Sequence, residues 1–427
     1  MPTSPLLEEL AWRGLLNQYT EGVGAALAGG SLTGYAGFDP TGSSLHIGHL
    51  VPVMALVHLQ RHGHRPIVLV GGGTGMIGDP SGRSAERNLL TLDQVADNAR
   101  AIRGQLEHFL DFDGPLAARM CNNADWLLEL RMVDYLRDVG KHFTINFMLQ
   151  KESVKSRLDS GLSYTEFSYM LLQACDFLEL YRREGCTLQL GGSDQWGNMT
   201  AGIELIRRSE GGEAHVFTLT LLLGADGKKF GKTAEGTSVW LDPARTSPYR
   251  FYQFWINTDD RDAGRYLRFF SLLDRDAIEA LEAAVAERPE SREAQQALAN
   301  DVTTRVHGAE AAKLAAEVSR VIFDRRLDPR ELSPEVLETL AAEIPCADVP
   351  SADGEAGFSV LDGLVELGMS KSKGEARRVL QQGGVSVNGV KLGAESSNFP
   401  HREALHGRYF LVRKGAREIG LLRVGRS

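Results

Sequence analysis

The stretch from Gly34 to His49, GYAGFDPTGSSLHIGH, decides how the rest of the chain is interpreted. It starts as a short apolar run, passes through a turn rich in Pro, Thr and Gly, and ends in two histidines three residues apart. A second apolar run, PIVLV at Pro66–Val70, follows a segment of helical spacing. These features predict a strand, a helix and a parallel strand, with the histidine motif at the start of the helix.

Later segments extend this pattern to an α/β protein. Two more apolar runs, LQLGGSDQWG from Leu188 and HVFTLTLLLGADG from His215, indicate strands that end in loops, whereas residues from about 86 to 190 are mostly helical by periodicity. We therefore predict a Rossmann-like parallel-sheet core with a helical insertion, followed by an all-α domain, a linker and a small α+β domain. The predicted boundaries are 1–222 for the core with its insertion at about 115–165, 223–343 for the helical domain, 344–357 for the linker and 358–427 for the last domain.

Charge is distributed unevenly along the chain. The 427 residues carry a formal net charge of -9, yet residues 358–427 hold 12 Lys and Arg against 6 Asp and Glu, and residues 1–357 hold 35 against 50. A basic C-terminal module on an acidic body is the electrostatics expected when a small domain binds a polyanion and the body handles a small substrate.

The cysteines and the N-terminus argue against several other classes of protein. Cys121, Cys175, Cys186 and Cys346 form no C-x-x-C pair and have no histidine at metal-ligand spacing, which disfavours structural zinc and a disulfide framework. No window approaches 18 consecutive apolar residues, and the first residues have neither signal-peptide nor transit-peptide character. We expect a reduced, cytoplasmic protein with no membrane span and no structural metal.

The histidine motif favours the binding of an anion. On a helix, His46 and His49 share one face of the first turns, and Gly48 allows close approach. Two imidazoles near a helix N-terminus can hold a triphosphate against hydrogen-bond donors and the positive end of the helix. The alternative interpretation is a pair of surface histidines beside a packing glycine.

A lysine-rich loop, GADGKKFGKT from Gly224 to Thr233, could supply complementary positive charge. Taken alone, such a loop is more typical of a solvated turn. A P-loop is excluded because its first required glycine would fall at Asp226. A flexible loop carrying Lys229 and Lys232 could instead close over a triphosphate and stabilise the charge that develops as a bond breaks.

Together and in this order, the two segments resemble the HIGH and KMSKS signatures of class I aminoacyl-tRNA synthetases. The second reads KFGKT here, as in the bacterial tyrosyl enzymes, and the resemblance extends through GDPSGRSAER, EFSYMLLQACDF and GGSDQWGN. It implies that tyrosine and ATP, with Mg²⁺, give tyrosyl-adenylate and pyrophosphate, and that tyrosine then passes to the terminal ribose of tRNA(Tyr) with release of AMP. It also implies a homodimer, with tRNA crossing between subunits, formed through the insertion around KHFTINFMLQKESVKSRL.

The segment EFSYMLLQACDF places Tyr169, Gln173 and Asp176 at i, i+4 and i+7 on one helix face. Without the resemblance, an ordinary solvated stripe explains this spacing equally well. The resemblance implies that Tyr169 and Gln173, helped by Asp79, bind the α-amino group of the substrate. It further implies that Asp176 and Tyr35 bind the phenolic hydroxyl. Such a site rejects phenylalanine because its buried polar partners would be left unpaired.

The resemblance also assigns contacts to ATP and to the transition state. It adds Gln195, near the reacting carboxylate, to the tyrosine-binding set, and it places Asp194 on the ribose. The implied ATP-binding residues are Gly37, Asp39, Thr41, His46, Gly48, His49, Gly192, Asp194 and Lys232. The implied catalytic residues, which stabilise the transition-state phosphates, are His46, His49, Lys229, Lys232, Thr233 and Arg87. Two positions depart from the family pattern: Arg83 stands where a Lys is common, and Ala36 stands where the family has a Cys near the ribose.

The C-terminal module is predicted to bind RNA. A helix (GEARRVL) is followed by two glycines and by VSVNGVKL, in which Asn388-Gly389 between alternating valines is a strong hairpin signal. The module resembles the RNA-binding domain of the ribosomal small-subunit protein S-four family. The residues implied to contact RNA phosphates are Lys371, Lys373, Arg377, Arg378 and Lys391. The alternative is a small domain with a solvated basic face.

Two further motifs and two further functions compete with this interpretation. GTGMIG at Gly73–Gly78 matches a dinucleotide fingerprint, but DPSG follows it and Asp93 is typical of a helix cap. Residues 369–372 spell most of KMSKS, but Ser370 or Ser372 is better explained as the cap of the next helix. The competing functions are a tryptophanyl synthetase or nucleotidyltransferase with the same histidine motif, and an inactive relative that serves as an RNA-binding scaffold.

Overall fold

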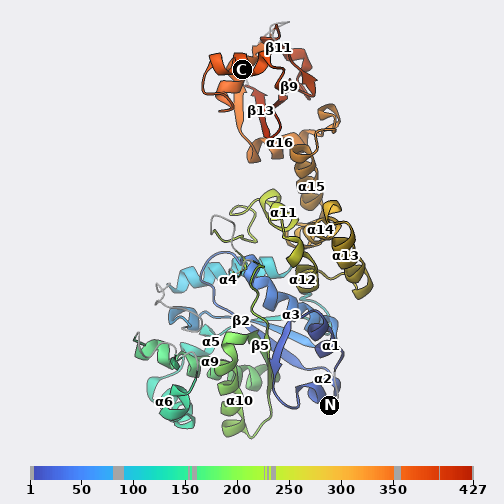
Figure 1. The fold of residues 1–427 in the computed structure, drawn as a ribbon. Helices are drawn as coiled ribbons and strands as arrows, with labels where there is room; N and C mark the ends of the chain where they lie inside the picture. Colours follow the sequence, from blue (N-terminus) through green and yellow to red (C-terminus); the bar gives the residue numbers. More distant parts are fainter. Residues whose placement is uncertain are drawn as a thin grey trace. The chain divides into compact units, whose positions relative to one another are not determined.

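The computed structural model describes residues 4–79, 91–151, 154–155, 161–225, 227, 230–231, 237–350, 357–393 and 395–425. The chain divides into two compact units (Figure 1). The first comprises Met1–Ser247 with Phe254–Val306, and the second comprises Pro248–Gln253 with His307–Ser427. Within the described ranges, no helix is both long enough and apolar enough to span a bilayer.

The first unit is built on a six-stranded sheet in the order β1-β6-β5-β2-β3-β4. Its strands are β1 (Leu16–Tyr19), β2 (Thr33–Phe38), β3 (Arg65–Val70), β4 (Arg119–Asn122), β5 (Cys186–Gly192) and β6 (His215–Leu219). All neighbouring strands are parallel except β1, which pairs antiparallel with β6. Strands β2 and β5 are neighbours although β3 and β4 lie between them in sequence. This is a topological switch point, and ligands bind beyond the carboxyl ends of the strands at such points.

Helices cover both faces of this sheet. Helix α3 (Leu50–Arg61) packs on β2, β3 and β5 from one side, while α9 (Tyr164–Glu184) and α10 (Trp196–Glu210) pack on β5 from the other. Other helices of the unit in the described ranges include α1 (Pro5–Trp12), α2 (Val23–Ala28), α4 (Leu92–Leu106), α5 (Ala124–Leu127), α6 (Met132–Asp138), α7 (Ile145–Leu149), α12 (Asp260–Phe270) and α13 (Arg275–Glu287). Helices α11 (Pro248–Ile256) and α14 (Glu293–His307) each contribute to both units.

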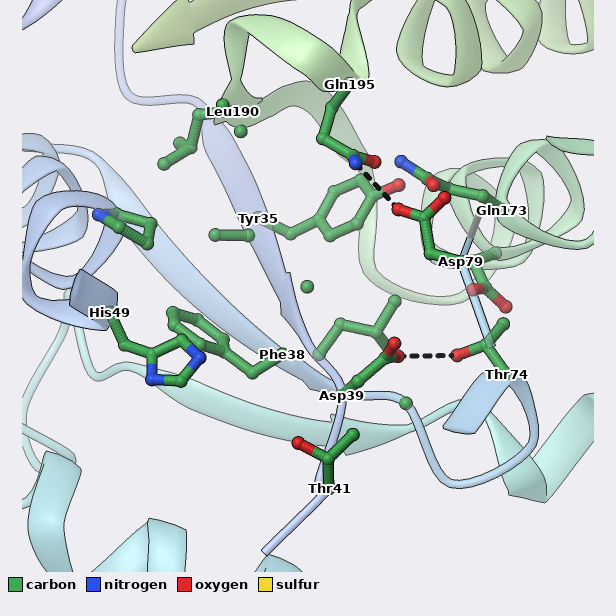
Figure 2. A pocket seen from close by; sticks show the side chains of 18 of the residues that line it. Tyr35, Phe38, Asp39, Thr41, His49, Thr74, Asp79, Gln173, Leu190 and Gln195 are labelled. Carbon is green, nitrogen blue, oxygen red and sulfur yellow. Dashed lines mark hydrogen bonds between the residues drawn. The ribbon is translucent and has the colours of Figure 1, made fainter. Parts of the chain in front are cut away.

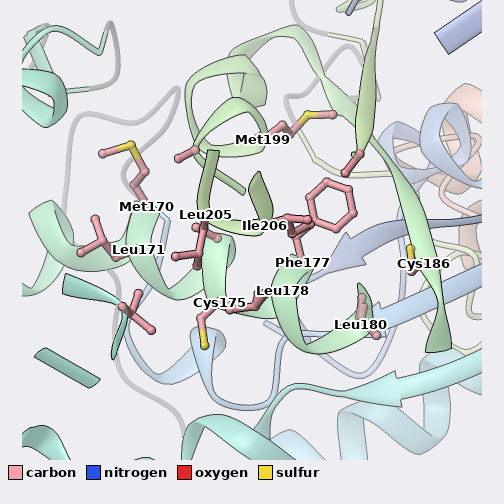
Figure 3. Close-up of a cluster of buried hydrophobic side chains, with 14 of the residues drawn as sticks. Met170, Leu171, Cys175, Phe177, Leu178, Leu180, Cys186, Met199, Leu205 and Ile206 are labelled. Atoms are coloured by element: carbon pink, nitrogen blue, oxygen red, sulfur yellow. The ribbon is translucent and has the colours of Figure 1, made fainter. Parts of the chain in front are cut away.

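Helix α9 is fixed at both ends and along its length. Ser163 caps its first turn by accepting from the backbone N–H of Glu166, and Gly185 ends it in the left-handed region at φ 61°. Its apolar side chains pack against α10 in the main core (Figure 3), where Phe177 and Leu180 are fully buried. Each such side chain contributes about 1.5–3 kcal/mol. The polar side chains on the same helix are therefore held on a rigid element.

The second unit combines helices with a five-stranded sheet in the order β10-β9-β12-β13-β7. Its elements are α15 (Ala309–Phe323), α16 (Pro334–Glu343), β7 (Cys346–Val349), β8 (Gly357–Ser359), α17 (Val360–Glu366), α18 (Lys373–Gln381), β9 (Val385–Val387), β10 (Val390–Lys391), β11 (Asn398–Pro400), β12 (Tyr409–Lys414) and β13 (Glu418–Val424). One core lies between α17, α18 and the sheet, and a second joins α15 and α16 to β12 and β13.

The predicted α/β fold class is confirmed, together with the strands at 34–38 and 66–70 and the hairpin at Asn388-Gly389. Both turn residues have positive φ, 49° and 79°, as a two-residue hairpin of this kind requires. Ser372 caps α18, as one of the two serines was expected to do. Asp93 instead lies in the first turn of α4, because Thr91 forms the cap and accepts from the backbone N–H of Gln94.

Three expectations differ from the structure. Strand β4 lies in the segment predicted to be helical, at the start of the predicted insertion. The sequence does not reveal this strand, because four half-exposed residues at a sheet edge leave no periodic signal. The predicted linker contains β7, which pairs in parallel with β13, while residues 351–356 lie outside the described part. The boundary predicted at 343 cuts through a packed unit, because Leu337 and Leu340 of α16 share a core with Leu421.

Candidate functional site

A pocket of about 550 Å³ opens at the switch point of the first unit. Its walls come from the carboxyl ends of β2, β3 and β5 and from side chains of α9 (Figure 2). His49 and Thr41 line one side of the drawn pocket, whereas Gln173 and Gln195 line another. The strand order therefore brings together segments more than 150 residues apart in sequence.

The buried end of the pocket is organised around Asp176, whose side chain is 2% exposed. Its Oδ2 accepts from Nδ2 of Asn123 at 2.9 Å, and its Oδ1 accepts from Nε1 of Trp126 at 2.8 Å. Burial raises the pKa of Asp176 to about 7, although the two hydrogen bonds act in the opposite direction. A carboxylate so held can still accept a hydrogen bond from a ligand.

Two buried polar atoms of the pocket lining, one on β2 and one on β5, lack hydrogen-bond partners in the described part of the chain. The hydroxyl of Tyr35, a side chain that is 1% exposed, has no hydrogen-bond partner among the described residues, and the same holds for Oε1 of Gln189. Both residues line the pocket and are paired across neighbouring strands. Burial raises the pKa of Tyr35 well above its usual range, so the hydroxyl remains protonated. Buried unpaired polar groups are costly, which makes both atoms candidates for contact with a ligand.

A second polar cluster lies across the pocket. Nε2 of Gln195 donates to Oδ2 of Asp79 at 2.7 Å (Figure 2), and Nδ2 of Asn198 donates to Oε1 of Gln173 at 3.0 Å. Tyr169 lines the same region and is buried, and its hydroxyl hydrogen-bonds with Thr74. An acidic group with several acceptors around it is suited to a cationic ligand group.

Asp39 follows β2 and receives a hydrogen bond from Oγ1 of Thr74 at 3.3 Å (Figure 2). This contact depends on a glycine, because a Cβ at Gly71 would lie 2.4 Å from Oδ1 of Asp39. Gly192 acts likewise at the end of β5, where a Cβ would lie 2.5 Å from Oδ1 of Asp194. These glycines therefore leave room for the two carboxylates.

The two motif histidines lie where the sequence predicts, at a helix start. The 3-10 helix η1 (Ile47–His49) leads directly into α3. Nδ1 of His46 accepts from the backbone N–H of Gly48, and Nδ1 of His49 accepts from the backbone N–H of His46, both at 3.1 Å. In the neutral form, each ring therefore carries its proton on Nε2 and presents a donor there. The rings stack with centroids 3.9 Å apart.

Glycines set the shape of the pocket near the histidines. A Cβ at Gly48 would lie 2.8 Å from Cε1 of His46, so a side chain at this position would displace the imidazole. Gly37 lines the pocket, and a Cβ there would meet no atom within 4 Å. The space beside Gly37 is therefore open to a ligand.

Part of the lysine-rich loop is anchored beside the histidine motif. Phe230 packs against an aromatic cluster whose ring centroids lie 5.0–6.0 Å away, formed by Phe254, Trp255, Tyr266 and Phe270. Gly231 has φ 99°, and a Cβ there would lie 3.4 Å from the backbone nitrogen of Gly48. The loop thus leaves its anchor close to the start of η1.

The structure brings the predicted small-molecule residues to one pocket. All six predicted tyrosine-binding residues line it. Of the predicted ATP-binding residues, Gly37, Asp39, Thr41, His46, His49, Gly192 and Asp194 line it too, and Gly48 stands behind His46. The predicted residues Arg87, Lys229, Lys232 and Thr233 lie outside the described part of the chain, as does Arg83. The sequence interpretation missed Thr74, Asn123, Trp126 and Gln189.

The predicted RNA-binding residues form a separate group in the second unit, which we name the basic face: Lys371, Lys373, Arg377, Arg378 and Lys391. All five side chains are exposed, and Lys373 pairs with Asp362 at 2.5 Å. Helix α18 supplies three of the five. Across the ranges that the structure describes, no three His, Cys, Asp or Glu side chains gather in a way that could hold a metal ion.

Comparison with known proteins gives consistent matches over nearly the whole chain. Residues 28–324 match the family model of class I tRNA synthetases (W and Y), and residues 340–422 match the tyrosine–tRNA ligase SYY-like C-terminal domain. The tyrosine–tRNA ligase of Anaeromyxobacter dehalogenans is 52% identical over 98% of this chain and 99% of its own length, and that of Roseiflexus castenholzii is 50% identical over the same shares. A C-terminally truncated mitochondrial tyrosyl-tRNA synthetase of Aspergillus nidulans superposes with a TM-score of 0.68 at 28% identity, covering 74% of this chain and 94% of that one.

Proposed function

Because the chain belongs to the tyrosine–tRNA ligases of the class I tRNA synthetase family, we propose how its own residues carry out the two steps of that ligation. The enzyme activates tyrosine with ATP and transfers it to tRNA, so tyrosine, ATP and tRNA are its substrates. The competing assignment to tryptophan is disfavoured, since the two relatives described above, which match 98% of this chain, are tyrosine–tRNA ligases.

The observation that carries the tyrosine site is the unpaired hydroxyl of Tyr35 beside Asp176. A substrate phenol placed there donates to the Asp176 carboxylate and accepts from Tyr35, so all three groups are satisfied. Phenylalanine would fill the same space but would leave the Tyr35 hydroxyl buried and unpaired, which costs about 1–3 kcal/mol, and would take from Asp176 the contact that the phenol adds to those of Asn123 and Trp126. Discrimination against phenylalanine therefore rests on this end of the pocket.

The opposite cluster is suited to the amino acid's charged groups. Asp79 and the amide oxygen of Gln173 accept from the substrate ammonium, and Tyr169 completes the contact. Gln195, which already donates to Asp79, lies where an amide can orient the reacting carboxylate. The substrate is held at both ends, and this fixes its carboxylate toward the histidines.

ATP, bound with Mg²⁺, occupies the space between Gly37 and the histidine pair in this proposal. Asp194 binds the ribose, and the Nε2–H groups of His46 and His49 donate to the phosphates at the start of η1. The tyrosine carboxylate attacks the α-phosphorus, and the bond to the β-phosphate oxygen breaks, releasing pyrophosphate. A terminal ribose hydroxyl of tRNA then attacks the adenylate carbonyl and releases AMP. We assign Arg87, Lys229, Lys232 and Thr233 to transition-state charge by family resemblance alone.

An exposed apolar patch supports a homodimer. The large hydrophobic side chains of α5–α7 and their connections that are at least 37% exposed are Leu128, Leu130, Met132, Val133, Leu136 and Ile145. Exposed large apolar side chains gathered in one region of a soluble protein are typical of an interface, and these six lie on the insertion that the family resemblance assigns to dimer formation. We place the enzyme in the cytoplasm, where tRNA is charged.

The activity is tested by tyrosine-dependent exchange of labelled pyrophosphate into ATP, with tryptophan and phenylalanine in parallel. Exchange with tyrosine alone is expected. Exchange with tryptophan would move the substrate assignment, and absence of exchange with all three would favour the RNA-binding scaffold.

The tRNA role of the second unit is tested with a fragment ending at His307. This end point is chosen because α15 and α16 share a core with β12 and β13, so that a fragment ending near residue 345 would expose it. The fragment is expected to retain pyrophosphate exchange and to charge tRNA poorly. Full charging would contradict the RNA-binding assignment.

A further inference from the structure

A cation stacked on an aromatic ring stands at the rim of the pocket. The guanidinium carbon Cζ of Arg245 lies 3.3 Å from the ring centroid of Trp240. Trp240 lines the pocket and meets His46 edge to face, with centroids 5.8 Å apart. His46 in turn stacks on His49. Arg245, Trp240 and the histidine pair thus form one continuous series of ring contacts.

The backbone holds this series in register with the histidine motif. The backbone N–H of Ile47 donates to Val239 at 3.0 Å, and that of Leu241 donates to Leu45 at 2.9 Å, so the two segments pair on both sides of Trp240. The turn that carries Arg245 is closed by the hydroxyl of Thr246, which accepts from the backbone N–H of Trp240 at 3.0 Å. The position of Arg245 is therefore set by the same segment that positions His46.

The charge of Arg245 faces the pocket mouth. A Cβ built on Gly42, a residue that lines the pocket, would lie 3.8 Å from Nη1 of Arg245. The side chain is exposed, and no hydrogen bond or ion pair joins it to any residue that the structure describes. The N–H donors of a guanidinium lie at the edge of its own plane, so Arg245 over the Trp240 ring can still contact a phosphate in bidentate fashion.

We propose that Arg245, supported by Trp240, binds the pyrophosphate portion of ATP and stabilises it as the leaving group of the first step. The inference rests on the proposed function, since it takes the phosphates to lie at the histidine pair. When the α-phosphorus forms its bond to the tyrosine carboxylate, the electron pair of the breaking bond passes to the bridging oxygen of pyrophosphate. A fixed cation beside that oxyanion contributes more in the transition state than in the ground state.

The test compares Arg245→Ala and Arg245→Lys with Arg275→Ala as the matched control. Arg275 is also an exposed arginine on a tryptophan, 4.6 Å from the ring of Trp12, but neither residue lines the pocket. Each variant is assayed for the single-turnover rate of adenylate formation, the KM for pyrophosphate in exchange, the Kd for tyrosine, and transfer to tRNA from preformed adenylate.

Arg245→Ala is expected to slow adenylate formation and raise the KM for pyrophosphate by about 10–100-fold, as loss of a charge-assisted contact predicts. Arg245→Lys should recover part of this loss, and Arg275→Ala should match the parent enzyme. The Kd for tyrosine should stay unchanged, because a contact to phosphate does not touch that end of the pocket.

Three outcomes would overturn the inference. Unchanged adenylate formation with slowed transfer would assign Arg245 to the tRNA terminus instead. An equal loss in tyrosine binding would reduce Arg245 to a structural role. Parental values in every assay would leave it no role in the reaction. If the parent enzyme itself does not exchange pyrophosphate in the presence of tyrosine, the proposed function fails. Measuring the parent alongside the variants distinguishes that result from a failure of the Arg245 inference.

Discussion

Asp176 and Arg377 are both charged side chains proposed to bind a substrate, but they stand in opposite surroundings. Asp176 is almost fully buried, and two donors fix its oxygens at 2.8–2.9 Å. Arg377 is exposed on α18, beside the other cations of the basic face. In the pocket, each buried polar atom makes a directional contact, and leaving such an atom unpaired costs considerable free energy. On the basic face, charges act additively, are hydrated, and are screened by salt.

The largest expected effect comes from Asp176→Asn. The new amide must direct its NH₂ group at Asn123 or Trp126, both of which are donors, and it cannot accept the substrate proton in the same way. The kcat/KM for tyrosine in pyrophosphate exchange should fall by about 10²–10³, corresponding to about 3–4 kcal/mol. Asp276→Asn, on the exposed first turn of α13, is the matched control and should behave as the parent. A loss of less than tenfold would remove Asp176 from the recognition of the phenol.

The next prediction is that pH changes tyrosine affinity and protein stability in opposite directions through the titration of Asp176. A pKa of about 7 for Asp176 lies above the unfolded value of about 3.9, so the protonated form is favoured in the fold. The Asp176 contribution to stability is therefore greatest below pH 4, declines as pH rises through 4–7, and is constant above. Tyrosine binding changes oppositely, because the phenol donates to the ionised carboxylate.

As the pH falls from 7 to 5, the Kd for tyrosine should rise by about tenfold per pH unit, because less of the Asp176 carboxylate is ionised. Calorimetric titration measures it, and phenylalanine, which lacks the hydroxyl, provides the control. A flat profile for tyrosine would show that Asp176 does not change its protonation on binding. As the pH falls over the same range, the free energy of unfolding of the parent should increase relative to that of Asp176→Asn, whose amide does not titrate.

A smaller effect is expected for Tyr35→Phe, which should lower the affinity for tyrosine without lowering the melting temperature. The change removes a buried hydroxyl that has no partner in the described structure, so the melting temperature should stay equal or rise. Tyrosine affinity should fall by about 5–10-fold through loss of one hydrogen bond. Tyr135→Phe is the control, since its hydroxyl is likewise buried and unpartnered but does not line the pocket. Equal affinity losses in both variants would contradict a specific role for Tyr35.

Much of the pocket could be predicted from sequence because its residues lie in segments with strong local patterns. The histidine motif begins a helix after a buried strand, and Tyr169, Gln173 and Asp176 follow helical spacing on α9. The partners of Asp176 carry no such pattern. Asn123 and Trp126 are more than 45 residues away and follow β4, a short edge strand that periodicity does not reveal.

Gln189 had a usable signal that was missed. It is the one polar residue between Leu188 and Leu190 in a buried strand, which in a parallel sheet predicts a buried amide in need of a partner. Its position opposite Tyr35 follows only from the strand order, in which β5 lies next to β2. In the second unit, the sequence predicts the helices α15 and α16 but not the domain to which they belong. Only their packing shows that they share a core with the C-terminal sheet.

The smallest effect is expected for Arg377→Gln on the basic face. Removing one phosphate contact of several should weaken tRNA binding only about two- to fivefold at moderate salt, without regard to tRNA sequence. It should also make the slope of log K against log salt concentration shallower by about 1. Filter binding of tRNA between 50 and 200 mM salt would measure both quantities, with Arg182→Gln as the control, because that exposed arginine is paired with Glu179 and Glu210 in the first unit. A large loss with an unchanged slope would mean that Arg377 makes a directional contact, and the basic face would then resemble the pocket in how it recognises its ligand.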